Sequence, residues 1–127
     1  MQDLKNAPIG IFDSGIGGLT VAKAVIEALP NEDIIYFGDT ARVPYGIKSE
    51  KTVRAYALQI TNFLLKRGVK MILIACNTVS ASAKEEIIQA AGNIPVLDVI
   101  TAGTKTAILH SGHKNIGVIG TLGTVNS

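Results

Sequence analysis

The sequence predicts an α/β fold in which helices cover both faces of a parallel sheet. Three observations point to this class. Short apolar runs alternate with longer amphipathic stretches along the 127 residues. The run at residues 69–75 is apolar almost without interruption, which is typical of a parallel strand covered on both sides. Glycine-rich or polar loops follow the apolar runs, as expected where a strand passes into a helix.

The expected strands and helices alternate strictly. The strands are predicted at residues 7–12, 34–37, 69–75, 94–100 and 116–119. The helices are predicted at residues 19–29, 49–67, 79–91 and 101–110. Ser49 is a good N-cap, and Gly68 and Gly92 suit positions just after helix ends. Apolar residues at helical spacing predict the buried sides of the first two helices: Leu19, Ala22, Val25, Ile26 and Leu29, then Val53, Tyr56, Ala57, Ile60, Phe63 and Leu64.

The last segment reads as an interrupted architecture. After the expected strand at residues 116–119, the chain ends in a Gly/Thr loop. Such a loop should lead into another helix, and none is expected in the residues that follow. The sequence therefore predicts a truncated sheet, less stable than a complete domain.

Composition sets limits on the kind of protein. Hydrophobic residues make up 47% and charged residues 17%, which excludes a disordered chain. The net charge is only +2 with no basic cluster, so no nucleic acid partner is expected. No apolar run approaches the roughly 20 residues needed to span a bilayer, and the polar start lacks a signal peptide. A cytoplasmic protein without membrane contact is expected.

The single cysteine, Cys76, follows the apolar run and precedes a helix. One cysteine excludes an internal disulfide and a cysteine-rich metal site. A thiol at a helix N-terminus is near the positive end of the helix dipole, which favours the reactive thiolate. Cys76 could equally be a small buried apolar residue. Position alone leaves both interpretations open.

The loops that follow parallel strands meet at one edge of the sheet, where ligands bind in open α/β folds. The first loop, residues 13–18, does not match a dinucleotide-binding motif, because Thr20 stands where a third glycine is needed. Its glycines predict a tight turn. Asp13 and Ser14 would cap the next helix, and Asp13 could instead bind an ammonium group or position a base; spacing alone favours the cap.

Other polar residues of these loops have both structural and functional interpretations. Tyr45 and Gly46 fit an ordinary turn, or they offer a hydroxyl and an open amide. The helix-start and terminal-loop residues, Asn77, Thr78, Thr121 and Thr124, would cap helices or hold a carboxylate. A phosphatase with a Cys-x5-Arg motif would need arginine six residues after Cys76, where Ser82 stands. His110 and His113 are expected at the surface, and no metal-ligand cluster is evident.

Four segments taken together resemble one family. They are residues 9–18 (IGIFDSGIGG), 38–46 (GDTARVPYG), 75–78 (ACNT) and 118–124 (VIGTLGT). Each is weak alone, but their order and spacing agree from residue 8 onward. The sequence resembles the N-terminal part of the glutamate racemases, of the cofactor-independent aspartate/glutamate racemase superfamily. The resemblance implies flavodoxin-like layers and glutamate as the ligand.

The resemblance also implies a reaction that inverts the α-carbon of glutamate without pyridoxal phosphate or metal, so no cofactor is expected. In the family, one cysteine thiolate removes the α-proton and a second cysteine on the opposite face returns one. Cys76 corresponds to the thiol that deprotonates D-glutamate, and Asp13 assists it or holds the ammonium group. The implied substrate contacts are Asp13, Ser14, Tyr45, Gly46, Asn77, Thr78, Thr121 and Thr124. The product would supply peptidoglycan synthesis.

The sequence departs from the family in length and in its single cysteine. The second cysteine is expected in a Gly-Cys-Thr-His stretch, which these 127 residues lack. Residues 1–100 should form the first, incomplete domain, and residues 101–127 the crossover and the first helix and strand of the second. The isolated chain should be inactive or perform half of the reaction, and its open sheet edge favours a homo-oligomer. Two alternatives stay open: a non-catalytic amino-acid-binding or interaction module, and a racemase for aspartate.

Overall fold

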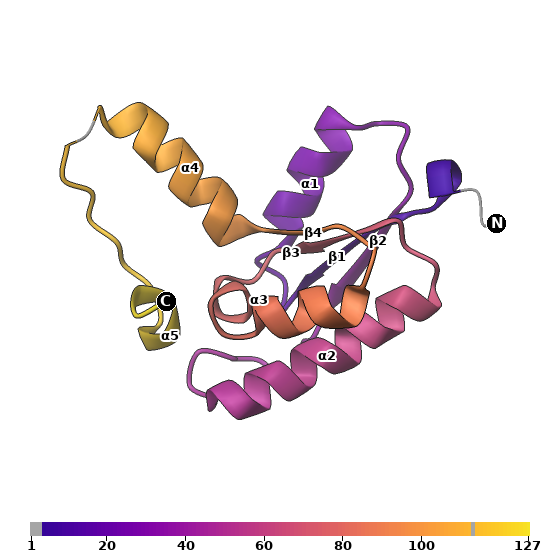
Figure 1. Ribbon diagram of the computed structural model, residues 1–127, viewed down its shortest axis with the longest axis horizontal. Helices are drawn as coiled ribbons and strands as arrows, with labels where there is room; N and C mark the ends of the chain where they lie inside the picture. Colours follow the sequence, from indigo (N-terminus) through magenta and orange to yellow (C-terminus); the bar gives the residue numbers. More distant parts are fainter. Residues whose placement is uncertain (1–3, 113) are drawn as a thin grey trace.

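A computed structural model describes residues 4–112 and 114–127, so the predicted surface position of His113 lies outside the described residues (Figure 1). The centre is a parallel sheet in the order β2-β1-β3-β4. Helix α1 covers one face, and α2 and α3 cover the other. This arrangement confirms the predicted fold class. The elements are η1 (Leu4–Asn6), β1 (Ile9–Asp13), α1 (Leu19–Ala28), β2 (Ile34–Gly38), α2 (Glu50–Lys66), β3 (Met71–Ile74), α3 (Asn77–Ala91), β4 (Val96–Asp98), α4 (Val99–Ser111) and α5 (Leu122–Val125).

The register of the strands aligns their carboxyl ends. Asp13 at the end of β1 pairs with Gly38 at the end of β2. Ile74 at the end of β3 pairs with Phe12 on one side and with Asp98 on the other. The loops that follow the strands therefore leave the sheet at the same level, as the parallel topology predicts.

The core has two layers because successive strand residues point to opposite faces. Phe12 packs with α2 and α3, whereas Ile11 packs on the side of α1. Gly10 allows α2 to approach β1 closely, since a Cβ atom there would lie 3.2 Å from Leu64 Cδ1. The predicted buried side of α2 is confirmed at its fully buried residues Val53, Ala57, Ile60 and Leu64.

The predicted apolar side of α1 is wrong at three residues. Ala22 is buried, but Leu19, Ile26 and Leu29 are about half exposed. The reason is that, among the described residues, α1 is the only helix that contributes to the hydrophobic cluster on this face of the sheet. Its flanks therefore have no neighbouring helix to contact.

Helices α3 and α4 each begin two residues earlier than predicted. Asp98 Oδ1 accepts a hydrogen bond from Thr101 N at 2.8 Å, so α4 begins at Val99 and β4 is shorter than residues 94–100. Helix α3 begins at Asn77, two residues before the predicted start, with Cys76 as its N-cap. The predicted caps at Ser49 and Gly92 are confirmed.

The predicted strand at residues 116–119 is wrong. The segment is extended but pairs with no strand among the described residues, and Ile119 is 98% exposed. A strand needs a hydrogen-bonded neighbour, which apolar side chains alone do not provide. The expectation that no helix follows is also wrong, because Thr121 caps the short helix α5.

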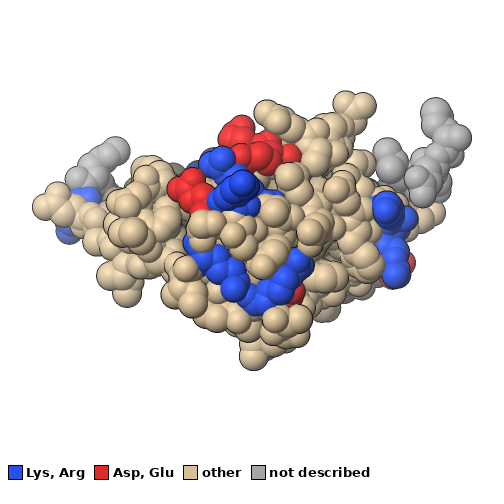
Figure 2. Space-filling view, turned by 90° about the horizontal axis from the view of Figure 1, so that it is seen from below, with Lys and Arg blue, Asp and Glu red and all other residues tan. Residues whose placement is uncertain are grey.

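The outer surface carries mixed charge. Arg54 on α2 pairs with Glu50 at 3.4 Å and with Glu86 on α3 at 3.1 Å. Figure 2 shows acidic and basic side chains close together on this side of the molecule. Among the described residues, no helix combines the length and apolar character that crossing a membrane requires.

Candidate active site

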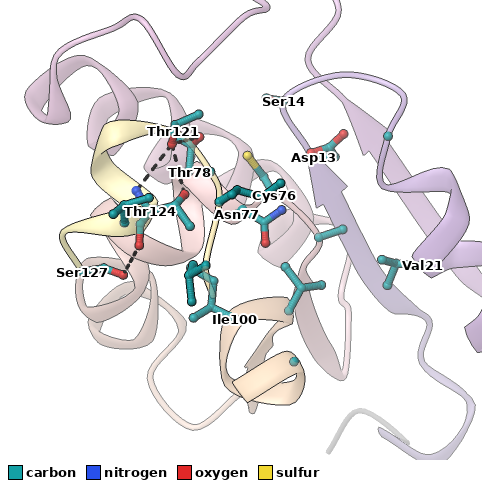
Figure 3. Close-up of a pocket in the computed structure, with 18 of the residues that line it drawn as sticks. Asp13, Ser14, Val21, Cys76, Asn77, Thr78, Ile100, Thr121, Thr124 and Ser127 are labelled. Carbon is teal, nitrogen blue, oxygen red and sulfur yellow. Dashed lines mark hydrogen bonds between the residues drawn. The ribbon is translucent and has the colours of Figure 1, made fainter. Parts of the chain in front are cut away.

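A cavity of about 1160 Å³ lies at the carboxyl ends of the strands. Its wall comes from the loop after β1, the start of α3, one side of α4, and the chain from residue 116 through α5 (Figure 3). The structure brings most of the predicted site residues into this one cavity: Asp13, Ser14, Cys76, Asn77, Thr78, Thr121 and Thr124. Residues from both ends of the chain thus share one space.

Cys76 is placed by the junction of β3 and α3. It is the N-cap of α3, and its carbonyl oxygen accepts hydrogen bonds from Ser80 N at 2.9 Å and Ser80 Oγ at 2.8 Å. The side chain is 5% exposed. In Figure 3 its sulfur points into the space between Asp13 and Thr121. The positive end of the α3 dipole therefore lies beside the thiol, in contact with the cavity.

Asp13 ends β1 and faces the start of α1. Its Oδ2 accepts hydrogen bonds from Gly15 N at 3.2 Å and Gly18 N at 3.0 Å. The N-cap residue of α1 is Gly18 and not Asp13 or Ser14, as a cap interpretation would have it, so the carboxylate holds the turn before the helix by binding the Gly18 amide. A Cβ atom at Gly18 would lie 2.7 Å from Asp13 Cβ and 2.9 Å from Ala75 Cβ. Glycine is needed for this close approach.

Tyr36 supports the Asp13 loop, and the sequence did not single it out. Its hydroxyl donates to the carbonyl oxygen of Gly15 at 3.1 Å. Burial raises the pKa of Tyr36, with smaller contributions from negative charge on Asp13 and Cys76. The phenol thus remains a neutral donor beside the site. Its position within a regular strand gave no sequence signal for this role.

Threonine hydroxyls connect the start of α3 to α5. Thr78 Oγ1 and Thr121 Oγ1 are 3.2 Å apart, and Thr121 Oγ1 and Thr124 Oγ1 are 3.0 Å apart. The side chain of Thr121 also accepts a hydrogen bond from Thr124 N at 3.4 Å. These hydroxyls line the cavity together with Asn77, and they can donate to a carboxylate.

Tyr45 and Gly46 lie behind the cavity wall instead of lining it. Tyr45 is 1% exposed, and its hydroxyl donates to Asp39 Oδ2. Gly46 packs against the terminal segment, since a Cβ atom there would lie 2.6 Å from Thr121 Cγ2. The residue of this loop that lines the cavity is Val43.

The cavity contains few charged groups. Among the described residues of its lining, Asp13 is acidic and none is Lys, Arg or His. A bound carboxylate would therefore contact hydroxyl groups, amides and the N-terminus of α3. The exposed His110 lies on α4, with Nδ1 2.9 Å from Thr106 O. No cluster that could hold a metal ion occurs among the described residues.

Helix α4 contributes lining residues that the sequence did not indicate. One side of this helix faces the cavity, and its small and apolar residues gave no signal of a ligand site. These residues are Val99, Ile100, Gly103, Thr104 and Ala107.

The sequence and the fold of the chain are similar to those of known proteins. A family model described as Asp/Glu/Hydantoin racemase matches residues 9–127. The chain belongs to this family. This Asp/Glu/Hydantoin racemase family member is similar to the glutamate racemase of Syntrophus aciditrophicus, with 56% identity over 94% of the chain and 44% of the relative. It is 58% identical to that of Chlorobaculum tepidum over 96% of the chain and 45% of the relative.

A solved glutamate racemase from Francisella tularensis, in complex with D-glutamate, superposes on this family member with a TM-score of 0.90. The two are 54% identical, and the match covers 97% of the chain and 46% of the solved one. The chain therefore spans just under half the length of the relatives that it matches.

Proposed function

We propose that this chain supplies the Cys76 side of a glutamate racemase active site. The observation that carries the proposal is the position of the one thiol, at the N-terminus of α3 and inside a cavity lined by Asp13 and the threonine hydroxyls. The similarity to glutamate racemases, one of them with bound D-glutamate, supports the choice of substrate.

In the proposed step, the Cys76 thiolate removes the α-proton of D-glutamate. The Cα–H bond breaks and an S–H bond forms, while the electron pair left on Cα delocalises into the α-carboxylate. A positive helix end favours the thiolate before the transfer. Hydroxyl and amide donors placed at the carboxylate would stabilise the charge that develops there.

The polar groups of the cavity suit the parts of an amino-acid dicarboxylate. Asp13 is the acidic group that would bind the ammonium group or assist Cys76. Ser14, Asn77, Thr78 and the hydroxyls of Thr121 and Thr124 would bind the carboxylates. Tyr45 and Gly46 would contribute through the placement of their loop. The proposed reaction uses no cofactor.

The wider arrangement belongs to the same proposal. Residues 1–100 would form the first domain, and residues 101–127 would begin a second. Support comes from α4, which has no buried residue. Exposed apolar side chains on the terminal segment would favour association of two copies. The product, D-glutamate, would serve peptidoglycan synthesis in the cytoplasm.

The test is exchange of the α-proton in heavy water. D-glutamate and L-glutamate are incubated separately with the chain and followed by NMR and chirality analysis. Because the sequence contains one cysteine, we expect deuterium incorporation into D-glutamate without inversion. Cys76→Ala should abolish it, and D-aspartate should exchange more slowly.

Each of the other outcomes would change the proposed function in a different way. Exchange of both enantiomers with inversion would mean that a second copy supplies the opposite base. Faster exchange of aspartate would assign the site to that substrate. Binding of glutamate with no exchange would indicate a binding module. The absence of both binding and exchange would overturn the proposal.

A further inference from the structure

A buried ionic and aromatic cluster lies behind the cavity wall, where the loop after β2 meets α2. Asp39 at its centre is 5% exposed. Its Oδ2 accepts one hydrogen bond from the Tyr45 hydroxyl and another from Arg42 Nε, the latter at 2.6 Å. A buried carboxylate is costly unless donors satisfy it. These two contacts therefore tie both ends of the Arg42 to Tyr45 segment to one anion.

Arg42 also attaches the loop to α2. Its Nη1 donates to Gln59 Oε1 at 2.6 Å, and its guanidinium carbon lies 4.0 Å from the centre of the Tyr56 ring. The Tyr56 ring in turn packs at 5.6 Å from that of Tyr45. One planar group thus makes two directed hydrogen bonds and a stacking contact, a combination that a lysine ammonium cannot reproduce.

The residues held by this cluster either line the cavity or pack directly behind its wall. Val43, between Arg42 and Tyr45, lines the cavity and approaches the first loop, since a Cβ atom at Gly15 would lie 3.4 Å from Val43 Cγ2. Gly46, after Tyr45, fits against Thr121 with no room for a side chain. The cluster therefore fixes one wall of the cavity relative to Thr121.

Tyr45, which donates to the buried Asp39 carboxylate, stays protonated. Burial raises the pKa of Tyr45 well above its ordinary value, and the hydrogen bond to Asp39 raises it further. Its hydroxyl therefore remains a donor to Asp39 through the neutral and moderately alkaline range.

We propose that Arg42, oriented by Asp39, is a positioning residue for the amino-acid substrate: it holds Val43 and Gly46 in place without touching the substrate. This inference rests on the proposed function, because the wall that Arg42 supports is that of the glutamate site.

The test uses a matched pair of substitutions on the full chain, Arg42→Lys and Arg67→Lys. Both keep the charge and both remove a guanidinium that stacks on a ring of α2, since Arg67 lies 4.7 Å from the centre of the Phe63 ring. D-glutamate affinity is measured by NMR titration, and thermal unfolding is recorded. Amide hydrogen exchange is followed at Lys48, whose N–H donates to Tyr45 O at 3.0 Å.

We expect Arg42→Lys to weaken D-glutamate binding about tenfold, because a loosened wall would occupy its binding position only about one tenth of the time. Exchange at the Lys48 amide should accelerate in this variant alone, and Arg67→Lys should bind as the unsubstituted chain does. If Arg42→Lys fails to fold, Tyr45→Phe removes a single hydroxyl from the same cluster and should shift both readouts in the same direction.

Unchanged affinity in Arg42→Lys or Tyr45→Phe would overturn the positioning role while leaving the proposed function intact. Equal losses in the two arginine variants would also overturn it, because the effect would then follow general stability. No binding of D-glutamate by the unsubstituted chain would overturn the proposed function and the positioning role together.

Discussion

Thr78 and Thr121 are 43 positions apart in the sequence, yet their hydroxyl oxygens lie 3.2 Å from each other. This contact joins the N-terminus of α3, which carries Cys76, to the cap of α5. Gly46, in the loop between β2 and α2, packs against Thr121 as well. Thr121 is therefore the point where three separate segments of the chain meet at the cavity.

Gly46→Ala tests this meeting point. The added methyl group would lie 2.6 Å from Thr121 Cγ2, so one of the two segments must move. We expect the free energy of unfolding to fall by about 1–2 kcal/mol and the Thr121 methyl resonance to shift. Gly117→Ala is the control, since nothing lies within 4 Å of a Cβ atom there. Identical behaviour of the two variants in urea unfolding and NMR would contradict the packing argument.

Tyr36→Phe removes the hydroxyl that holds the Asp13 loop through Gly15 O. The free energy of unfolding should fall by about 1 kcal/mol, and the Gly18 amide, which donates to Asp13 Oδ2, should exchange faster with solvent. Ser111→Ala serves as the control, because it removes a similar hydroxyl-to-carbonyl bond on α4, made to Ile108 O. Equal Gly18 exchange in both variants would show that Tyr36 does not support the loop.

Local features of the sequence predicted the fold and the position of the thiol. Helical spacing and Ser49 located α2, and the apolar run before Cys76 located β3, because these signals depend on residues close in sequence. Parallel topology then placed Asp13 and Cys76 at one edge of the sheet. The family resemblance added the roles proposed for these residues.

Features that depend on distant partners were not predictable. Residues 116–119 have the composition of a strand, but pairing requires a neighbour that no local pattern specifies. The direction of the Tyr45 side chain follows from Asp39 and the Tyr56 ring, which the chain brings there only after folding. Tyr36 looked like an ordinary strand residue, because its partner is a backbone carbonyl.

The Asp98 cap should make stability depend on acid pH. Burial would raise the pKa of Asp98, but hydrogen bonds from Lys84 Nζ and from the amide and hydroxyl of Thr101 outweigh burial and lower the pKa. A depressed pKa stabilises the fold above about pH 3.9, the ordinary value for Asp. This contribution is lost as the pH falls through the lower folded-state value.

Asp98→Asn should therefore lower the free energy of unfolding by about 2 kcal/mol at pH 7, with the difference narrowing as the pH falls below about 3.9. Urea unfolding over this pH range measures both effects. The exposed Asp33, changed to Asn, provides the control. The lowered pKa of Asp98 would be contradicted if the difference in the free energy of unfolding between Asp98→Asn and the unsubstituted chain grew toward acid pH.

Thr61 on α2 carries a buried hydroxyl without a hydrogen-bond partner among the described residues. Burying an unpaired hydroxyl costs about 1–3 kcal/mol. Valine has nearly the same shape and lacks the hydroxyl, and both residues are branched at Cβ, so the helix conformation is unaffected. Thr61→Val should therefore raise the free energy of unfolding by about 1 kcal/mol.

Thr106→Val is the matched control for this prediction, because Thr106 lies on the exposed side of α4 and its hydroxyl donates to Ala102 O at 3.0 Å. It should change the free energy of unfolding by less than about 0.5 kcal/mol. Urea unfolding of the two variants at neutral pH gives the comparison. A destabilised Thr61→Val would mean that the hydroxyl has a partner in solution, such as a bound water molecule, whose loss costs more than the desolvation that the substitution relieves.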